Sequence, residues 1–386
     1  MQDMLTRSPD IAYSGFQAEH RPRCTASKTI FRQLMTFAQQ ILTFLVVASV
    51  LGLSEEKDTL PLPVATVDLT TLLSKCTRNT LAFISEDAIA IGCYPGNGPS
   101  QGAIVTFRWG AGQLRLSATR DLALDRAPFN PELYGVARGS LLSFLTVTPE
   151  FLTADLKLKE ALPNGLLKAP VQQANLVAQW QPNGAWRLYR LVPTIELVRA
   201  GMGEILSFSD EFVVYRADHK VHIETIDGTH AGMFNEPPRS TCHVGILGRN
   251  RLFLACADRS IVDFNGKEVF KIPLQGWGFR VGSSKNGERL SFDTYTRTIS
   301  STQRISEFIE SLFSLGMGPN IEANGEAVHV IDTRTGGKCF DLQSPKHLLG
   351  LAGEYHADIS PSGRFVAVLA AQKLSLYELP GSCPAK

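Results

Sequence analysis

The first candidate for a catalytic residue in this sequence is a serine, Ser100. Residues 98–102, Gly-Pro-Ser-Gln-Gly, match the pattern G-x-S-x-G, in which a serine nucleophile occupies a sharp turn between a strand and a helix. Here the sequence before it, ending near Cys93, and the sequence after it, AIVTFRW, both have the residue pattern of strands. Strands on both sides predict a loop between strands and not a hydrolase site.

Histidines are the candidates for metal ligands in this sequence. His219 and His222 lie three residues apart in DHKVHIE, whose alternation predicts a strand. Side chains at odd separation on a strand point to opposite faces, so we do not expect these two to bind one metal ion. The sequence contains no H-E-x-x-H, C-x-x-C, P-loop, G-x-G-x-x-G or EF-hand motif. We predict no metal ion, no cofactor and no catalytic residue.

Acidic and aromatic residues cluster at two further places. Asp210 and Glu211 are adjacent, but nothing in the sequence shows the burial that would separate their pKa values, so solvated turn acids are expected. Trp180 and Trp186 flank a Pro-Asn-Gly turn and are expected to pair across a hairpin, as a core contact.

The loop Gly276-Trp277-Gly278-Phe279-Arg280 supplies the candidate binding residues, Trp277 and Arg280. Its glycines allow close approach of the backbone, and an aromatic ring beside an arginine can recognise a ligand. The alternative is a plain turn whose aromatic side chain packs against the fold.

Composition excludes several classes of protein. The chain has 386 residues, of which 44% are hydrophobic, and 38 basic residues balance 37 acidic ones. This composition is typical of a globular protein and not of a disordered or collagen-like one. The near-neutral charge gives no general attraction to phosphate backbones, so we predict no nucleic-acid partner.

An apolar segment at residues 34–53 indicates export. Basic residues precede it and the acidic stretch Glu55-Glu56-Lys57-Asp58 follows it, which favours translocation of the downstream chain. The segment is either a cleaved signal peptide or an N-terminal signal anchor. We therefore divide the chain into a polar, disordered leader at 1–34, the export segment at 35–54 and a single domain at 55–386, with Met1 or Met35 as the start. The domain is expected to be periplasmic or extracellular, and its membrane contact is limited to residues 34–53 if these are not cleaved.

Six cysteines follow the leader, which suits an oxidising compartment. Pairing two strands around Arg249 places Cys242 opposite Cys256, within disulfide range, although two buried thiols would give the same sequence. Cys76 with Cys93 and Cys339 with Cys383 are pairs suggested by proximity alone.

Short alternating apolar runs, separated by Asn-Gly and similar turns, fill the chain after Ser54. Similar units start at Leu81, Leu141, Asn175, Leu206, Cys242, Phe279 and His356, on average about 46 residues apart, which is typical of a four-stranded propeller blade. The hairpin from Asn175 is either a unit of its own or the outer half of one. We predict an all-β propeller with seven blades, within a range of six to eight. A short amphipathic helix is expected near 301–314, inserted between strands of one blade, and residues 63–69 are expected to complete the last blade.

The last unit carries a resemblance. HADISPSGRFVAV from His356, followed by KLSLYEL from Lys373, resembles the blades of WD40-like and TolB-like propellers, and AVHVIDTRTGGK from Ala327 resembles their outer strands. The Gly-His and Trp-Asp pairs of WD40 repeats are missing, so the resemblance implies an architecture and no activity. The leading functional hypothesis is an exported module that binds an unidentified protein or small molecule. The alternative is an extracytoplasmic enzyme with its site in the central channel of the propeller.

Overall fold

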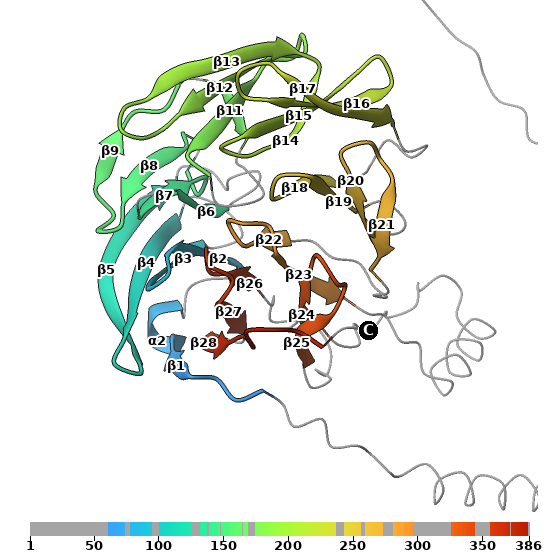
Figure 1. The fold of residues 1–386 in the computed structure, drawn as a ribbon. Coiled ribbons are helices and arrows are strands. Elements are labelled where there is room, and N and C mark those ends of the chain that lie inside the picture. The colour runs from blue at the N-terminus through green and yellow to red at the C-terminus, as the bar shows by residue number, and fades with distance from the viewer. Residues whose placement is uncertain are drawn as a thin grey trace, which may run out of the picture. The chain divides into compact units, whose positions relative to one another are not determined.

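Alternating apolar side chains build seven four-stranded antiparallel sheets in the computed structural model (Figure 1). The structure describes residues 61–73, 78–94, 100–124, 132–136, 139–146, 148–163, 165–168, 174–236, 243–255, 259–272, 281–295, 326–343, 356–370 and 372–384. The chain divides into a unit of residues 1–59 and a unit of residues 60–386, and all described residues belong to the second. Each sheet is a blade, and blades are numbered 1 to 7 from β2 onward.

The strands of each blade follow one another along the chain, except at the last blade. Blades 1 and 2 contain β2 (Arg78–Ser85), β3 (Ala88–Tyr94), β4 (Ser100–Gly110), β5 (Gln113–Leu124), β6 (Leu133–Val136), β7 (Ser140–Ser143), β8 (Glu150–Thr153) and β9 (Leu158–Glu160). Blades 3 and 4 contain β10 (Leu166–Lys168), β11 (Leu176–Trp180), β12 (Ala185–Arg190), β13 (Glu196–Met202), β14 (Glu204–Phe208), β15 (Phe212–Ala217), β16 (Lys220–Thr225) and β17 (His230–Asn235). Blades 5 and 6 contain β18 (His243–Leu247), β19 (Arg251–Ala255), β20 (Arg259–Asp263), β21 (Glu268–Lys271), β22 (Val281–Ser283), β23 (Arg289–Tyr295), β24 (Glu326–Asp332) and β25 (Lys338–Gln343). Blade 7 contains β26 (His356–Ile359), β27 (Phe365–Ala370), β28 (Lys373–Glu378) and β1 (Ala65–Asp68).

Hydrophobic clusters join the blades into a closed ring. Each of seven clusters draws its buried side chains from two successive blades, and the cluster of Phe83, Phe107, Phe365 and Leu376 joins blade 7 back to blade 1. We call each such boundary a seam. The first strands of the blades lie nearest the centre of the ring and the last strands lie at its periphery (Figure 1). The core is therefore distributed over the seams, as expected for blades that cannot bury both faces alone.

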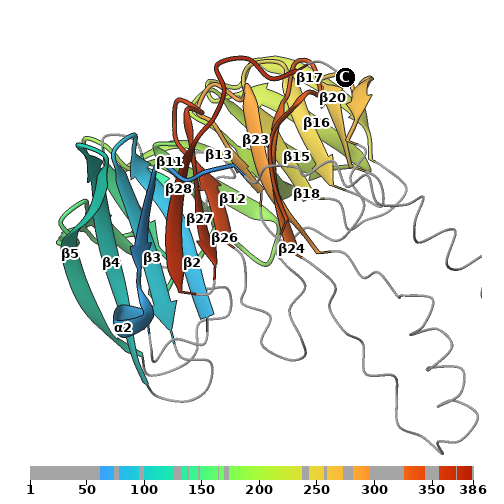
Figure 2. The ribbon, with the colours of Figure 1, turned by 90° about the horizontal axis from the view of Figure 1, so that it is seen from below.

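An N-terminal strand completes the last blade. β1 pairs with β28 in an antiparallel register that places Ala65 opposite Leu376, and the edge of blade 7 is thereby covered. Asp68 then accepts hydrogen bonds from the backbone nitrogen and the hydroxyl of Thr70, which starts the short helix α2 (Thr70–Leu73). Seen from the side, α2 lies at one end of the strands (Figure 2). The predicted strand at 63–69 and its role in closing the ring are confirmed.

The seven-bladed propeller predicted from the repeat is confirmed, with two differences in its units. The units predicted to start at Leu141 and Asn175 begin one strand earlier, with β6 and β10. These first strands have only four and three residues, so their alternation is too short to see in the sequence. The helix expected near 301–314 belongs to the segment between β23 and β24 of blade 6, which lies outside the described residues.

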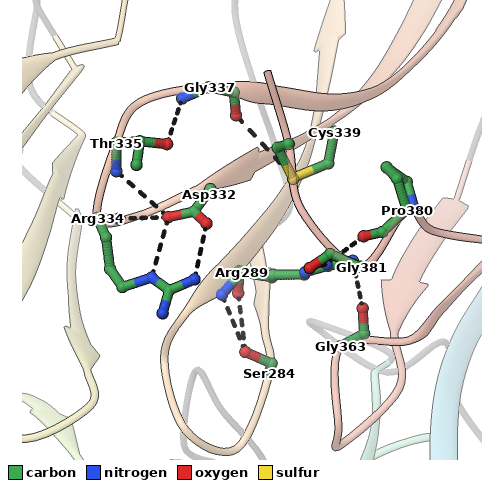
Figure 3. The surroundings of a disulfide bond; sticks show 11 residues. Ser284, Arg289, Asp332, Arg334, Thr335, Gly337, Cys339, Gly363, Pro380 and Gly381 are labelled. Carbon is green, nitrogen blue, oxygen red and sulfur yellow. Dashed lines mark hydrogen bonds and ion pairs between the residues drawn. A yellow bond between two sulfur atoms is a disulfide. The ribbon is translucent and has the colours of Figure 1, made fainter. Parts of the chain in front are cut away.

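The C-terminal tail is fixed to blade 6 by a covalent bond and by an arginine. Cys339 in β25 forms a disulfide with Cys383, with Cα atoms 4.7 Å apart. Arg289 in β23 donates hydrogen bonds to the carbonyl oxygens of Gly363 at 2.9 Å, of Gly381 at 3.1 Å and of Pro380 (Figure 3). The seam between blades 6 and 7 thus joins two blades and the chain end.

Candidate functional site

Four turns from successive blades gather at one end of the ring and form the candidate site. In each blade the first turn joins the first and second strands, and in blades 4 to 7 it spans residues 209–211, 248–250, 284–288 and 360–364. The first strands lie nearest the centre of the ring, so the turns that follow them meet at one end of it.

A serine at the end of the first strand shapes three of these turns. The hydroxyl oxygen of Ser209 accepts a hydrogen bond from the backbone nitrogen of Phe212 at 3.1 Å. Ser284 does the same for the backbone nitrogen of Arg289 at 3.0 Å, and Ser360 for that of Phe365 at 3.1 Å. Such side-chain acceptors fold a short turn tightly without a long loop. The three serines therefore give the turns of blades 4, 6 and 7 a common, fixed start.

Contacts between the turns hold neighbouring blades in place on the side of blades 6, 7 and 1. The backbone nitrogen of Lys285 donates to the carbonyl oxygen of Pro361 at 2.8 Å, which links blade 6 to blade 7. The carboxylate of Glu86, in the first turn of blade 1, accepts hydrogen bonds from the backbone nitrogen of Ser362 and from its hydroxyl at 2.7 Å.

The same chain of contacts continues through blades 3, 4 and 5. Glu211 pairs with Arg249 at 3.1 Å, and Asp210 accepts a hydrogen bond at 2.6 Å from the backbone nitrogen of Asn175, which follows the first strand of blade 3. Blades 5 and 6 meet through glycines: a Cβ atom on Gly287 would lie only 2.0 Å from the backbone nitrogen of Gly248. The first turns of six blades are thus connected in sequence around the ring.

A cavity of about 690 Å³ lies among these turns, and we call it the turn pocket. Its lining combines two cationic and two carboxylate side chains with small and polar ones: Ser209, Asp210, Glu211, Gly248, Arg249, Lys285, Asn286, Pro361 and Ser362. The charged side chains are exposed, whereas Ser209 is buried. The pocket is therefore an open polar site on a framework of turns that support one another.

A cluster of aromatic and charged side chains supports the seam between blades 3 and 4. The buried ring of Trp186 lies under the guanidinium of Arg199 and beside Tyr215, and Arg199 forms an ion pair with Glu224. Glu224 also accepts a hydrogen bond from the Tyr215 hydroxyl at 2.8 Å. Burial first, and then the hydrogen bond and charge of Glu224, raise the pKa of Tyr215 to about 12. This cluster positions blade 4, whose first turn supplies Asp210 and Glu211 to the pocket.

A second polar cluster supports blade 6 beside the C-terminal tail. Asp332 lies at the end of β24 and accepts hydrogen bonds from Arg334 and from the backbone nitrogen of Thr335 (Figure 3). Burial by itself would raise the pKa of Asp332, but the hydrogen bonds and charge of Arg334 outweigh it and the pKa is lowered. Burial also lowers the pKa of Arg289, which holds the tail carbonyls. Asp332 remains a carboxylate and fixes the turn after β24.

The predicted binding and disulfide residues fall outside the described part of the chain. Trp277 and Arg280 belong to the segment 273–280 between β21 and β22, and Cys242 and Cys256 flank β18 and β19, so these remain predictions. The strand register from which the disulfide was inferred is confirmed, because Leu247 lies opposite Arg251 and His243 opposite Ala255. The pairing of Cys339 with Cys383 is confirmed, and Cys93 is also disulfide-bonded, whereas Cys76 lies outside the described residues.

Other sequence-based expectations can be compared with the structure directly. Ser100 was expected in a loop between strands but begins strand β4, because pairing with β5 extends to Leu124. Trp180 pairs with Trp186 across the β11–β12 hairpin, as expected. His219 was expected in a strand but lies in the β15–β16 turn with a φ of 60°, while His222 stacks on Tyr215. Within the described residues there is no group of three or more His, Cys, Asp or Glu placed to hold a metal ion.

Membrane-spanning helices were searched over the same residues. None of the helices there combines the length and the apolar character needed to cross a bilayer. The apolar segment 34–53 is outside this part of the chain.

Comparison with known proteins gives matches only among solved structures. No family model matches the sequence, and no curated protein matches it. The chain is similar to the C-terminal WD40 domain of Sif2, with 13% identity and a TM-score of 0.42 over 83% of this chain and 99% of that one. It is also similar to the WD40 β-propeller domain of Doa1, with 11% identity and a TM-score of 0.43 over 80% and 95%, and to a chain of the Mitotic Checkpoint Complex, with 10% identity and a TM-score of 0.48 over 84% and 94%. The seven sheets and their seams establish independently that this chain is a seven-bladed β-propeller.

Proposed function

We propose that this protein is an exported binding module that holds a segment of a partner polypeptide in the turn pocket. The observation that carries the proposal is the pocket itself: four turns, fixed to one another, present side chains of both charges and polar groups around one cavity. A preformed site of this kind binds without a large ordering cost. Its mixture of cations, carboxylates, hydroxyl and amide groups matches the groups that a polypeptide offers.

Export is supported by chemistry at two places in the chain. The disulfide between Cys339 and Cys383 is a bond that persists in oxidising compartments. The apolar segment 34–53, with basic residues before it and acidic residues after it, suits a signal peptide or a signal anchor. Non-reducing peptide mapping of the protein recovered from the cell exterior or periplasm should show the Cys339–Cys383 linkage and, after cleavage, an N-terminus near residue 54.

Site-specific cross-linking tests the binding proposal. A diazirine-bearing lysine analogue replaces Lys285 in the pocket, and in a matched variant it replaces Lys267, an exposed lysine in the β20–β21 turn outside the pocket. We expect a polypeptide adduct from position 285 in producing cells and none from position 267. An absence of adducts at 285, or equal adducts at both positions, would contradict the proposal.

The enzyme hypothesis predicted from sequence gives a different outcome in the same experiment. An enzyme acting at this end of the ring on a small substrate would form no polypeptide adduct at position 285. The cross-linking result therefore separates the two classes of function.

A further inference from the structure

We infer that the polypeptide segment held in the turn pocket is acidic, and that Lys285 and Arg249 bind its side-chain carboxylates. This inference rests on the proposed function and adds the chemical class of the bound segment. It follows from a comparison of the charged groups around the pocket: some already form hydrogen bonds or ion pairs within the chain, and others do not.

The carboxylates around the pocket all have partners within the chain. Those of Asp210 and Glu86 accept backbone hydrogen bonds from Asn175 and Ser362, and each of these contacts joins two blades. Glu211 pairs with Arg249, and the nearby Glu288 accepts hydrogen bonds from Asn286 and Arg334. Asp210 and Glu211 each use one carboxylate oxygen in these contacts, so a basic ligand group would have to share carboxylates that already join two blades. The carboxylates are therefore structural acceptors first.

The cations differ from the carboxylates in this respect. Lys285 is held through its backbone nitrogen, while no described residue forms a hydrogen bond or ion pair with its exposed ammonium group. Arg249 has a side chain that is 84% exposed, and only its Nη2 atom contacts Glu211. An exposed ion pair contributes little to stability, so a ligand carboxylate can share or replace Glu211 at low cost. The ammonium group of Lys285 and the remaining N–H groups of Arg249 are therefore the donors that the pocket offers to a ligand.

Glycines bring the two cations onto adjoining turns. A Cβ atom on Gly248 would lie 2.7 Å from the carbonyl oxygen of Asn286, so the turns of blades 5 and 6 meet backbone to backbone. Arg249 follows Gly248, and Lys285 precedes Asn286. Both therefore project from one rigid junction, where a guanidinium can bind a carboxylate in bidentate fashion and an ammonium can bind a second acid beside it.

Peptide binding to the full-length, oxidised protein tests the inference. Three fluorescent ten-residue peptides with blocked termini would be compared: one alternates Glu with Gly and Ser, one has Lys in place of Glu, and one has Gln. We expect the acidic peptide to bind most tightly and its affinity to fall as salt is raised. Lys285→Met and Arg249→Gln should each lower that affinity about tenfold. The matched variants Lys267→Met and Arg187→Gln remove exposed cations outside the pocket and should leave it unchanged.

The outcomes separate failure of the inference from failure of the proposed function. If the acidic peptide, and not the other two, also suppresses the polypeptide adduct formed at position 285, the inference is supported. If an adduct forms at position 285 but the basic or neutral peptide competes equally well, the pocket is a polypeptide site and the inference is wrong. Equal binding of the acidic peptide to the parent and to the Arg249→Gln, Lys285→Met double variant would also overturn it. Thermal unfolding of each variant alongside the parent excludes loss of folding as the cause.

Discussion

The seams between blades 3 and 4 and between blades 6 and 7 are both secured by an arginine, but in different ways. Arg199 of blade 3 binds the carboxylate of Glu224 and the backbone carbonyl oxygen of Thr225 in the next blade, and lies over the ring of Trp186. Among the described residues, the guanidinium of Arg289 in blade 6 donates hydrogen bonds to backbone carbonyl oxygens alone, two of which belong to the C-terminal tail. The first seam includes an ion pair and a cation–π contact between particular side chains. The second depends on where the tail lies.

Position in the chain explains the difference. Blades 3 and 4 are internal, so the strands on either side of their seam are held at both ends by the rest of the ring. Residues 379–384, after β28, form no strand that could hold them in place. Carbonyl recognition by Arg289 is useful only when the tail is held in place, and the Cys339–Cys383 disulfide holds it there. At this seam a covalent bond thus performs a task that side-chain contacts perform between blades 3 and 4.

Removal of the aromatic ring at the internal seam should have the largest effect. Trp186 is 1% exposed and packs against Tyr215 and Arg199, so Trp186→Ala leaves a cavity and removes a cation–π contact. We expect a loss of about 3–5 kcal/mol in the free energy of unfolding, measured by urea denaturation. Trp180→Ala, at the half-buried partner across the hairpin, should lose clearly less. Equal losses would show that the hairpin, and not the seam, carries the stability.

Loss of the disulfide at the terminal seam should have the next largest effect. The bond closes a loop between cysteines 44 residues apart, and Cys339→Ser should lower the free energy of unfolding by about 2–4 kcal/mol. Cys383→Ser and the double variant should show the same loss, because either substitution removes the one bond. A double variant markedly less stable than both single variants would indicate separate packing roles for the two side chains.

Coupling between Arg289 and the disulfide distinguishes the two seams most directly. Arg289→Met should lower the free energy of unfolding by about 1–3 kcal/mol in the parent protein, since it removes hydrogen bonds from a charged donor. In the Cys383→Ser background the loss should be smaller, because the carbonyl groups of Pro380 and Gly381 are no longer held beside the guanidinium. Arg199→Met should cost the same in both backgrounds. An Arg289 effect independent of the disulfide would mean that the tail is held by other contacts.

The sequence predicts the ring of blades better than it predicts the short first strand of a blade. Strands with regular alternation, such as Phe365–Ala370 and Lys373–Glu378, are evident because alternate residues enter two different seams. β6 and β10 are too short to show alternation, so two blades were assigned one strand late. The closing strand β1 was predictable because an isolated alternating segment at the start of a propeller has few other places to pair.

The turn pocket could not be predicted for a different reason. Asp210 and Glu211 are visible in the sequence as adjacent turn acids, but their neighbours Arg249, Lys285 and Ser362 come from three other blades. Only closure of the ring brings these turns together, and no local spacing records it. The repeated serine before each turn is a signal that could have helped, because Ser209, Ser284 and Ser360 occupy equivalent places in their blades.

The ionisation of Tyr215 gives the smallest and most specific test of the internal seam. Its pKa is raised to about 12 in the folded protein, by burial and by Glu224, while an unfolded chain has a tyrosine pKa of about 10. Between these values the unfolded state loses the proton first, so the free energy of unfolding should fall as pH rises from about 10 to 12. Tyr215→Phe should cost about 1 kcal/mol at neutral pH through loss of the hydrogen bond to Glu224, and should remove this part of the pH dependence.

Tyr189→Phe is the matched control for that prediction, because it removes a comparable hydrogen bond, to Gln179 at 3.2 Å, on the neighbouring strand β12. It should retain the fall in stability between pH 10 and 12. Urea denaturation of the three proteins across this range measures the difference. If Tyr215→Phe keeps the full pH dependence, the proton is lost elsewhere in the chain and Glu224 is bound chiefly by Arg199. Cys383→Ser removes no contact of Tyr215 and should leave the slope unchanged, which assigns the alkaline transition to the internal seam.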